Sequence, residues 1–401
     1  MSDRTGTRPD PFAAEFHQNP YPAYRQLRES GAVHPSALGM SAYYRYTDCS
    51  AILRDRRWGC GFNEERLQRV RRLGIAQVFM HQNPPEHTRL RRFVSDPFTH
   101  NAVAAMRTHI ADVCDRLLDS ALAGPETDLV SAYAHPLPVM VIGDLLGVPE
   151  ADREPFYAWS RALARGLDPD FAVTAEVIDQ RREAVLSLNS YFASLASKRR
   201  KCPADDLVTH LTQVQDTDDL SEPDLLATCV LILVAGHETT ASLIGNGILA
   251  LLRNPEKLAM VREQDPEITD GAWVEELLRY EAPVRLVKRT ALEDLDYGGT
   301  VYKRGETVAV VLGSANRDAA VFTNPDVLDF TRPNNHLAFS LGTHFCLGAS
   351  LAHLEGSLAI AALLHRAPEL RLAEDDPPYV KAPVFLRGLE RLPVRLGKHA
   401  R

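Results

Sequence analysis

One long apolar stretch in the second half of the chain constrains the fold more than any other feature. Residues 224–252 place apolar side chains at three- and four-residue intervals, which predicts an α-helix. Ser221 can cap its start, and Asn254-Pro255 closes its far end. At 1.5 Å per residue this helix is roughly 45 Å long, enough to cross a whole domain. Its most apolar run, residues 225–236, is shorter than the ~20 residues of a membrane span, so we expect a buried helix and no membrane.

The middle of this predicted helix is polar. The segment Ala235-Gly236-His237-Glu238-Thr239-Thr240 interrupts the apolar residues with a glycine, two β-branched residues and a charged pair. Burying such groups costs free energy, so the segment has either a functional reason or a polar stripe that reaches solvent. A zinc-protease helix is excluded, because it needs a second histidine at position 241, which is Ala241.

Helical periodicity extends over most of the chain, whereas strand-like runs are few and short. We therefore expect a mainly α fold with minor β structure. Besides residues 224–252, helices are predicted over residues 103–122, 173–197, 272–280 and 349–364, and strands over residues 33–46, 295–302, 307–312 and 383–396.

Nothing in the sequence divides the 401 residues into separate domains, because there is no repeat and no long linker. We expect one domain over residues 1–401, with residues 1–18 as a flexible N-terminal segment. A content of 45% apolar and 24% charged residues is typical of a globular protein. The net charge of −8 argues against a nucleic-acid partner. Six cysteines without a C-x-x-C pair and the lack of a signal peptide indicate a cytoplasmic protein.

The segment Phe339-Ser340-Leu341-Gly342-Thr343-His344-Phe345-Cys346-Leu347-Gly348 carries the strongest chemical signal. It places a cysteine directly before the predicted helix 349–364, where backbone N–H groups and the helix dipole stabilise a thiolate. A buried structural cysteine and a catalytic nucleophile are the alternatives. The flanking glycines let the backbone approach something large and flat, and Phe339 can shield the sulfur. A metal-bound thiolate is the favoured interpretation.

This segment resembles the haem-binding loop of bacterial cytochrome P-450 monooxygenases, with Cys346 in the place of the axial ligand. Other segments follow in the order of that family, and the resemblance extends from about Asn19 to Val394. It implies a single cytochrome P-450-type domain with a long central helix over the haem and small sheets at one side. Two residues depart from the family pattern, Ser340 in place of a glycine and His353 in place of an arginine. The matching segments are Pro84 to Arg91, Pro136 to Pro149, Ala235 to Thr240, Glu276-Leu277-Leu278-Arg279 and Phe330-Thr331-Arg332-Pro333.

The resemblance also implies roles for individual residues. Cys346 binds the iron of haem b, and Glu238 and Thr239 form an acid–alcohol pair that delivers protons during catalysis. Glu276, Arg279 and Arg332 form a structural ion-pair triad. The remaining cofactor-binding residues are His87, Arg91, Arg289 and His344, expected at the haem propionates, together with Phe339, Gly348 and Ala235. An apolar wall of the substrate pocket is expected from Val284, Leu286, Val287, Val384 and Phe385.

The expected reaction is the insertion of one atom of O₂ into an apolar small molecule, in bacterial secondary metabolism. Electrons are expected from NAD(P)H through a ferredoxin and its reductase. Arg89 and Arg92 are either a docking patch for this donor or a plain solvated face. The basic segment Glu64 to Arg72 is either a solvated face or a site for an anionic substrate or a carrier-protein phosphopantetheine. An oxidative coupling or ring-forming haem enzyme, or a catalytically silent haem-bearing module that docks a carrier protein, are the alternative functions.

Overall fold

The computed structural model describes residues 13–36, 38–61, 78–165, 173–217, 220–264, 271–333, 335–380 and 385–397. The helices are α1 (Ala14–Gln18), α2 (Tyr21–Ser30), α3 (Tyr46–Arg54), α5 (Glu86–Arg92), α6 (His100–Ala105), α7 (Arg107–Ala121), α8 (Pro136–Leu146), α9 (Arg153–Arg165), α10 (Ala175–Lys201), α11 (Leu207–Thr217), α12 (Glu222–Leu252), α13 (Pro255–Arg262), α14 (Ala272–Tyr280), α15 (Leu312–Ala315) and α16 (Ala349–Arg366). The strands are β1 (Val33–Pro35), β2 (Ser41–Tyr43), β3 (Trp58–Gly59), β4 (Glu126–Asp128), β5 (Val287–Ala291), β6 (Leu295–Tyr297), β7 (Thr300–Tyr302), β8 (Thr307–Val310), β9 (Arg371–Leu372) and β10 (Pro393–Arg395).

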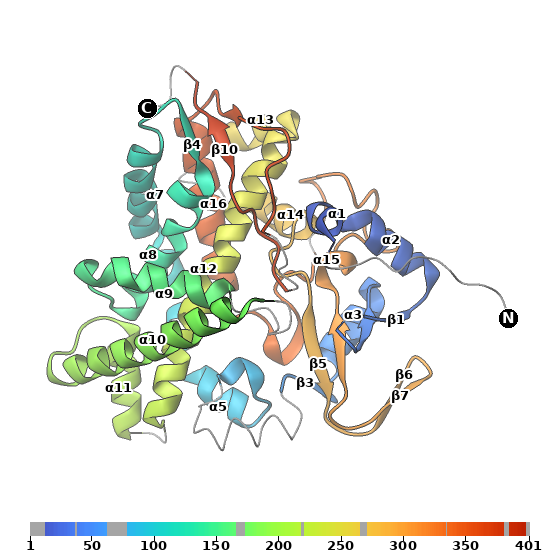
Figure 1. The fold of residues 1–401 in the computed structure, drawn as a ribbon, viewed down its shortest axis with the longest axis horizontal. Helices are drawn as coiled ribbons and strands as arrows, with labels where there is room; N and C mark the ends of the chain where they lie inside the picture. Colours follow the sequence, from blue (N-terminus) through green and yellow to red (C-terminus); the bar gives the residue numbers. More distant parts are fainter. Residues whose placement is uncertain are drawn as a thin grey trace.

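Helix α12 runs through the centre of the molecule (Figure 1). The Oγ of Ser221 accepts a hydrogen bond from the N–H of Asp224 at 3.2 Å, so the predicted cap is confirmed. By length and composition α12 could cross a membrane, since an 18-residue window has a mean hydropathy of 1.5. However, 61% of that window is buried inside the protein, and α8, α10, α14 and α16 all pack against the helix. Its apolar character is therefore explained by its place in the core.

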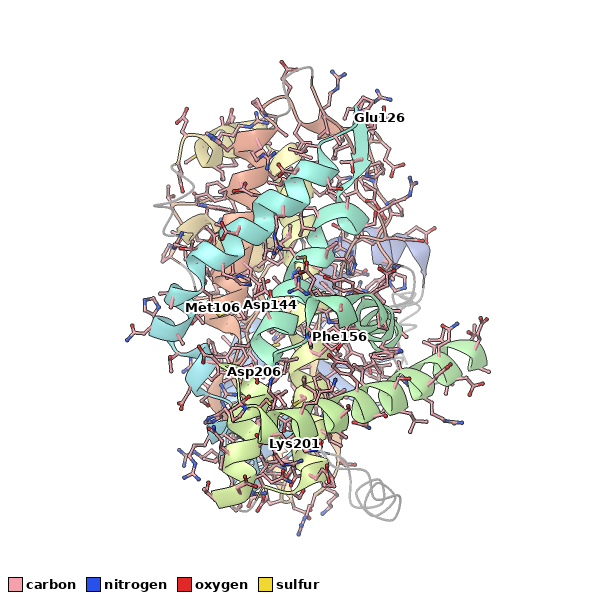
Figure 2. All side chains as sticks on the ribbon, turned by 90° about the vertical axis from the view of Figure 1, so that its left-hand side faces the viewer. Met106, Glu126, Asp144, Phe156, Lys201 and Asp206 are labelled. Carbon is pink, nitrogen blue, oxygen red and sulfur yellow. The ribbon has the colours of Figure 1, made fainter. Side chains whose placement is uncertain are left out.

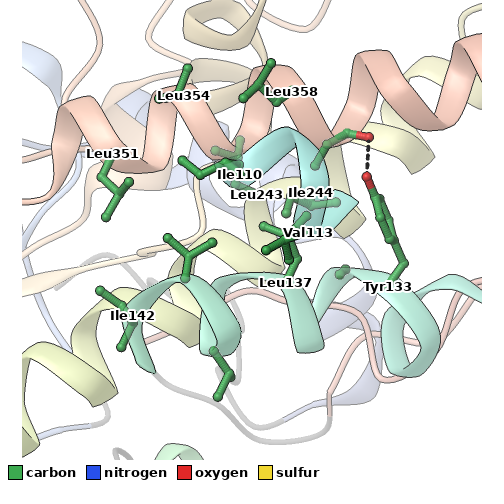
Figure 3. Packing of buried hydrophobic residues seen from close by; sticks show 14 of the residues in the cluster. Ile110, Val113, Tyr133, Leu137, Ile142, Leu243, Ile244, Leu351, Leu354 and Leu358 are labelled. Carbon is green, nitrogen blue, oxygen red and sulfur yellow. Dashed lines mark hydrogen bonds between the residues drawn. The ribbon is translucent and has the colours of Figure 1, made fainter. Parts of the chain in front are cut away.

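The main core lies between α7, α8, α12 and α16. Ile110 and Val113 of α7, Ile244 of α12 and Leu358 of α16 are buried side by side (Figure 3). A π-helical turn, η3 (Val130–Ala134), precedes α8, and the hydroxyl of Tyr133 in this turn donates to the backbone oxygen of Ala359 at 2.9 Å. This bond satisfies a polar group that would otherwise be buried without a partner, and it ties η3 to α16.

The largest sheet and the hairpin of β6 and β7 lie on one side of the helices, whereas β4 and β10 lie apart from them, at the top of the view (Figure 1). The largest sheet has the strand order β1-β2-β8-β5-β3, and β2 pairs in parallel with β8, so that two segments far apart in the sequence lie side by side. Strands β6 and β7 form the predicted hairpin around Gly298-Gly299, and β4, β10 and β9 form a separate small sheet. The prediction of a mainly α protein with small sheets is confirmed.

Three local predictions differ from the structure. The single helix expected over residues 103–122 is two helices, α6 and α7, with a turn at Met106 between them. The apolar periodicity continues across this turn, so the sequence pattern does not show it. Part of the N-terminal segment 1–18 that was expected to be flexible is helical, because Ala14–Gln18 form α1 and His17 is buried, while residues 1–12 lie outside the described residues. Only Pro393–Arg395 of the strand expected over residues 383–396 form a regular strand, while residues 383 and 384 lie outside the described residues.

Candidate functional site

The loop that carries Cys346 is held by its own backbone hydrogen bonds. The N–H of Cys346 donates to the carbonyl of Phe339 at 3.0 Å, and Phe345 donates to Gly342 at the same distance. Gly342 has a φ of +71°, and a β-carbon there would lie 2.6 Å from the backbone oxygen of Leu53. Only glycine therefore fits this close contact between the loop and α3, and the contact fixes Cys346 at the start of α16.

The protein by itself does not stabilise a thiolate at Cys346. Burial raises the pKa of this thiol, and the backbone N–H of Gly348 and the charge of Arg91 oppose this effect only in part. The backbone N–H of Gly348 does favour the thiolate, as expected, but burial has the larger effect. A raised pKa also makes Cys346 a poor free nucleophile, whereas a metal ion deprotonates a coordinating thiol outright.

Positively charged and imidazole side chains gather next to the Cys346 loop. His87 is 1% exposed, and neither ring nitrogen has a hydrogen-bond partner among the described residues. Its ring lies 4.3 Å from that of His344, and Arg91 and Arg289 are close enough to act on His344. Burial is the largest cause that lowers the pKa of His344, and together with the charges of His87, Arg289 and Arg91 it brings that pKa to about 3. A buried imidazole without a partner, beside two guanidinium groups, fits the carboxylates of a bound haem.

The polar segment of α12 remains helical throughout. The hydroxyls of Thr239 and Thr240 donate to the carbonyls of Ala235 and Gly236 at 2.9 and 3.0 Å, within a helix that has no break. Gly236 and Thr239 therefore do not interrupt the helix. A β-carbon at Gly236 would lie 2.8 Å from Cγ1 of Ile142, so this glycine allows α8 to pack closely on α12. Ala235 is exposed and Thr239 partly exposed, although both lie at the middle of the core helix.

Glu238 lies next to two histidines that sequence reasoning did not select. Its Oε2 is 3.5 Å from Nε2 of His237 and 3.7 Å from Nδ1 of His135, and His237 also meets the Oγ of Ser160 at 3.0 Å. Burial and the charge of Arg161 lower the pKa of His135 to about 4, and burial lowers that of His237. Both imidazoles are thus neutral near pH 7. No sequence spacing indicates this group, because its members come from the junction of η3 and α8, from α9 and from α12.

The structure brings Glu276, Arg279 and Arg332 together. Arg279 binds both carboxylate oxygens of Glu276 at 2.7 Å, with both side chains fully buried. The Nε of Arg332 lies 3.4 Å from the same carboxylate, and the N–H of Asp329 donates to it at 2.9 Å. The carboxylate therefore anchors the segment that leads to the Cys346 loop to α14, which is a structural role.

The five residues expected to line the substrate pocket do not all lie together. Val284 pairs with Leu386 in an isolated antiparallel β-bridge. Val284 and Val287 both pack against the core of the large sheet. Phe385 lies near these residues, under the Nζ of Lys288 at 4.7 Å. Leu286 packs in a different cluster with Tyr24, so its expected place in the pocket is not supported. Val384 lies outside the described residues, as does the basic segment Glu64 to Arg72.

The expected docking residues Arg89 and Arg92 lie on α5. Arg89 pairs with Glu86 at 2.9 Å, and the guanidinium groups of Arg89 and Arg92 lie 5.9 and 5.3 Å from the ring centre of Phe93. Arg92 is exposed, and Phe345, next to Cys346 in the sequence, is 44% exposed.

The second departure from the family pattern, His353, pairs with Glu275 at 3.3 Å, and His336 reaches the same carboxylate at 2.9 Å.

A groove of ≈ 650 Å³ lies elsewhere, between α7, α8 and α9, on the side of the molecule that faces the viewer in Figure 2. His109 and Arg153 both pair with Asp144, so charges in the groove are partly neutralised. It shares no residue with the Cys346 loop or with the polar segment of α12. The groove is lined by His109, Asp112, Asp115, Arg116, Asp119, Asp144 and Arg153.

Comparisons with known proteins agree with this arrangement. The model of the cytochrome P450 family matches residues 167–380. The 6-deoxyerythronolide B hydroxylase of Saccharopolyspora erythraea is 38% identical over 97% of this chain and 99% of that protein. Among solved structures, P450BioI in complex with an acyl carrier protein ligated to hexadec-9Z-enoic acid has a TM-score of 0.87 and 37% identity, covering 96% of this chain and 99% of that chain. CxnD, a P450 enzyme for C–S bond formation in chuangxinmycin biosynthesis, has a TM-score of 0.87 and 33% identity over 100% of both chains.

The family model covers the loop of Cys346 as well as the polar segment of α12, and the matches to the relative and to the two solved structures extend over nearly the whole chain. Members of the family are haem-thiolate enzymes that need O₂ and electrons from redox partners. The chain therefore belongs to the cytochrome P450 family and is an oxidoreductase of the monooxygenase kind.

Proposed function

We propose that this protein inserts one atom of O₂ into an apolar small molecule, by hydroxylation or epoxidation, in bacterial secondary metabolism, with Cys346 as the axial ligand of haem b. The observation that carries the proposal is the position of Cys346 at the start of α16, beside the group of His87, Arg91, Arg289 and His344. When bound, haem with a thiolate ligand activates dioxygen, because the thiolate pushes electron density onto the iron and favours O–O bond breaking.

The described residues fit this cofactor in shape as well as in charge. A β-carbon at Gly348 would have only one heavy atom within 4 Å, at 4.0 Å on the ring of Phe98, so the backbone here leaves room for a flat group. The exposed Ala235 on α12 would face the opposite side of that group, and Phe339 would lie beside the sulfur. His87, Arg91, Arg289 and His344 would hold the two carboxylates.

The proposal assigns proton transfer to Glu238 and Thr239. Glu238 is 20% exposed and lies beside the neutral imidazoles of His135 and His237, so it can take a proton from solvent and hold it at Oε2. The hydroxyl of Thr239 can both donate and accept, which allows it to pass a proton on. Val284, Val287 and Phe385 would provide an apolar surface for the substrate.

The experiment that tests the proposal is a difference spectrum of the reduced protein under carbon monoxide. The Soret band is expected to move far to the red, because the ligand opposite CO is a thiolate. Cys346→Ala should abolish this band, whereas Cys202→Ala, which removes an exposed thiol, should keep it. A wild-type protein without haem, or a band that survives Cys346→Ala, contradicts the assignment.

A second candidate function is oxidative bond formation without net hydroxylation. It is supported by the similarity to CxnD, whose description names C–S bond formation. Mass analysis of the product separates the two, because hydroxylation adds one oxygen atom and coupling or ring closure removes two hydrogens. A catalytically silent carrier-binding module is less well supported, since Glu238 and Thr239 are both present.

We further propose that the protein acts in the cytoplasm, where a ferredoxin and its reductase supply electrons from NAD(P)H. Phe345, whose ring is exposed, is next to Cys346 in the sequence, and the exposed Arg92 follows Arg91, whose charge acts on Cys346; the two exposed side chains would suit an acidic partner with an apolar contact. A carrier-bound substrate is supported by the complex of P450BioI with an acyl carrier protein. The two modes of delivery are distinguished by measuring the binding of free and carrier-bound forms of one substrate, with the spin-state shift of the haem as the readout.

A further inference from the structure

Ser340 has a backbone conformation that its side chain does not favour. Its φ is +62°, in the left-handed region. Among the described residues other than glycine, Asn324 also has a positive φ. Asparagine enters this region more readily than serine, and glycine enters it without strain. The Cys346 loop therefore keeps a serine at a position where glycine would be less strained, which suggests that the hydroxyl has a use.

The hydroxyl of Ser340 binds the guanidinium group of Arg289. The Nη2 of Arg289 donates to Oγ of Ser340 at 3.0 Å, and its Nη1 donates to the backbone oxygen of Lys288 at 2.9 Å. Both side chains are enclosed, since Ser340 is 9% and Arg289 4% exposed. Ser340 also donates its backbone N–H to Leu337 at 2.8 Å. The serine is thus fixed by the loop, and the guanidinium of Arg289 is held by the serine, by the backbone of Lys288 and by Cys60.

This bond joins two parts of the protein that are far apart in the sequence. Arg289 lies on β5 in the large sheet, whereas Ser340 lies on the loop that ends at Cys346. The charge of Arg289 acts on His344 of the same loop. An arginine side chain has several rotatable bonds, and one short hydrogen bond from a strained but rigid residue restricts where its charge can lie.

We propose that Ser340 is a positioning residue that holds the guanidinium of Arg289 beside the cofactor and thereby tunes haem retention and reduction potential. The proposal rests on the proposed function in one respect, namely that Arg289 faces a haem carboxylate. A positive charge held close to the haem favours its reduced form, because that form carries one more electron. A guanidinium that is held in place also binds a carboxylate with a smaller loss of conformational entropy.

Two variants separate the hydroxyl from the backbone strain. Ser340→Gly removes the hydroxyl and relieves the strain, and Ser340→Ala removes the hydroxyl and keeps the strain. Both are expected to release haem to apomyoglobin several-fold faster than the wild type. Both should also lower the equilibrium constant for one-electron reduction of the haem about three- to tenfold, which lowers the reduction potential by roughly 30–60 mV. Ser340→Thr, which restores a hydroxyl, should recover part of both properties.

Stability provides the control, because strain predicts a different order of the variants. Chemical unfolding of the purified proteins should show Ser340→Gly to be more stable than Ser340→Ala, although their potentials and haem-release rates are alike. If both variants keep the wild-type potential and haem-release rate, the positioning role is wrong. If the potentials follow stability instead, strain alone explains the effect and the role is equally wrong.

A double-mutant cycle with Arg289→Lys tests the partner. Lysine keeps the charge and loses the planar fork, so Ser340→Ala should have little further effect on the potential in the Arg289→Lys background. Additive effects contradict the link between the two side chains. A wild-type protein without the red-shifted CO band contradicts the proposed function instead, and the same cycle measured by chemical unfolding still decides whether the two side chains are coupled.

Discussion

Glu355 on α16 is a single residue with a large expected effect on stability. It is 1% exposed, lies near Cys114 of α7, and its Oε2 has no hydrogen-bond partner among the described residues. Burial raises the pKa of Glu355 well above the usual range, so the folded protein holds this carboxyl in its neutral form. In the unfolded chain a glutamate has a pKa of about 4.3.

Because the folded pKa is raised, Glu355 makes the protein less stable as the pH rises. Above pH ~4.3 the folded state keeps a proton that the unfolded state has lost, and stability falls by about 1.4 kcal/mol per pH unit until the folded pKa is reached. Glu355→Gln should remove this loss. Chemical unfolding between pH 5 and 8 should show that the free energy of unfolding of Glu355→Gln increases relative to that of the wild type as the pH rises. The control variant Glu390→Gln, at an exposed position, should show no such increase. Parallel curves for Glu355→Gln and the wild type contradict a neutral buried carboxyl.

Thr239 and Thr240 form a matched pair for testing proton transfer. Each hydroxyl donates to the carbonyl four residues earlier, but Thr239 is partly exposed whereas Thr240 is 3% exposed. Thr239→Ala should leave haem binding intact and divert electrons from product to hydrogen peroxide, because a hydroxyl that passes protons is lost. Thr240→Ala loses the same kind of backbone bond and should stay coupled. The ratio of product to NAD(P)H consumed measures both, and full coupling in Thr239→Ala excludes the role.

At the scale of elements, the close packing of α8 on α12 depends on Gly236. A β-carbon there would meet Cγ1 of Ile142 at 2.8 Å, so we expect Gly236→Ala to destabilise the protein by about 1–3 kcal/mol despite the higher helix propensity of alanine. Gly245 on the same helix is the control, because its β-carbon would find Leu389 and Val130 at an ordinary 3.8 Å. Gly245→Ala should be neutral or stabilising by up to about 1 kcal/mol.

Chemical unfolding of the two alanine variants measures this difference. Repeating Gly236→Ala in an Ile142→Ala background provides a second check, since the smaller side chain leaves room for the added methyl group. An equal cost in both backgrounds, or equal effects at positions 236 and 245, shows that the contact between α8 and α12 is not what requires glycine.

At the scale of the whole molecule, one buried ion pair joins the two ends of the chain. Arg387 binds Oε2 of Glu281 at 2.7 Å and donates to the backbone oxygen of His17 at 2.6 Å, while Tyr21 of α2 donates to the same glutamate at 2.9 Å. Burial alone would raise the pKa of Glu281, but the charges of Arg387 and Arg317 outweigh it and lower the pKa. The pair therefore contributes stability at neutral pH, which is lost as the pH falls through the folded pKa.

Arg387→Ala is expected to destabilise the protein by about 3–5 kcal/mol, because it leaves the carboxylate of Glu281 buried with a weaker partner. The exposed pair of Arg391 and Glu374, at 3.0 Å, is the control, and Arg391→Ala should cost about 1 kcal/mol or less. Chemical unfolding measures both costs, and limited proteolysis of Arg387→Ala should cut first near α1 and α2. Similar costs for the two variants show that burial adds nothing to this pair.

The sequence by itself predicted the features that depend on neighbours along the chain. The helices α12, α14 and α16, the cap at Ser221 and the hairpin at Gly298-Gly299 follow from periodicity and turn chemistry within short windows. The Cys346 loop was found in the same way, because its glycines and cysteine are adjacent in sequence. The three-residue spacing of Glu276 and Arg279 likewise places the pair on one face of a helix.

Only the tertiary structure decided which distant residues meet. Ser340 and Arg289 are 51 residues apart, and Ser160 is 77 residues from His237, so no local pattern could pair them. The contact of Gly236 with Ile142 and the separation of Leu286 from Val284 also depend on how helices and strands pack. The physical reason is that periodicity reports the conformation of a segment and the face it buries. Contacts between segments instead depend on which faces the whole chain brings together.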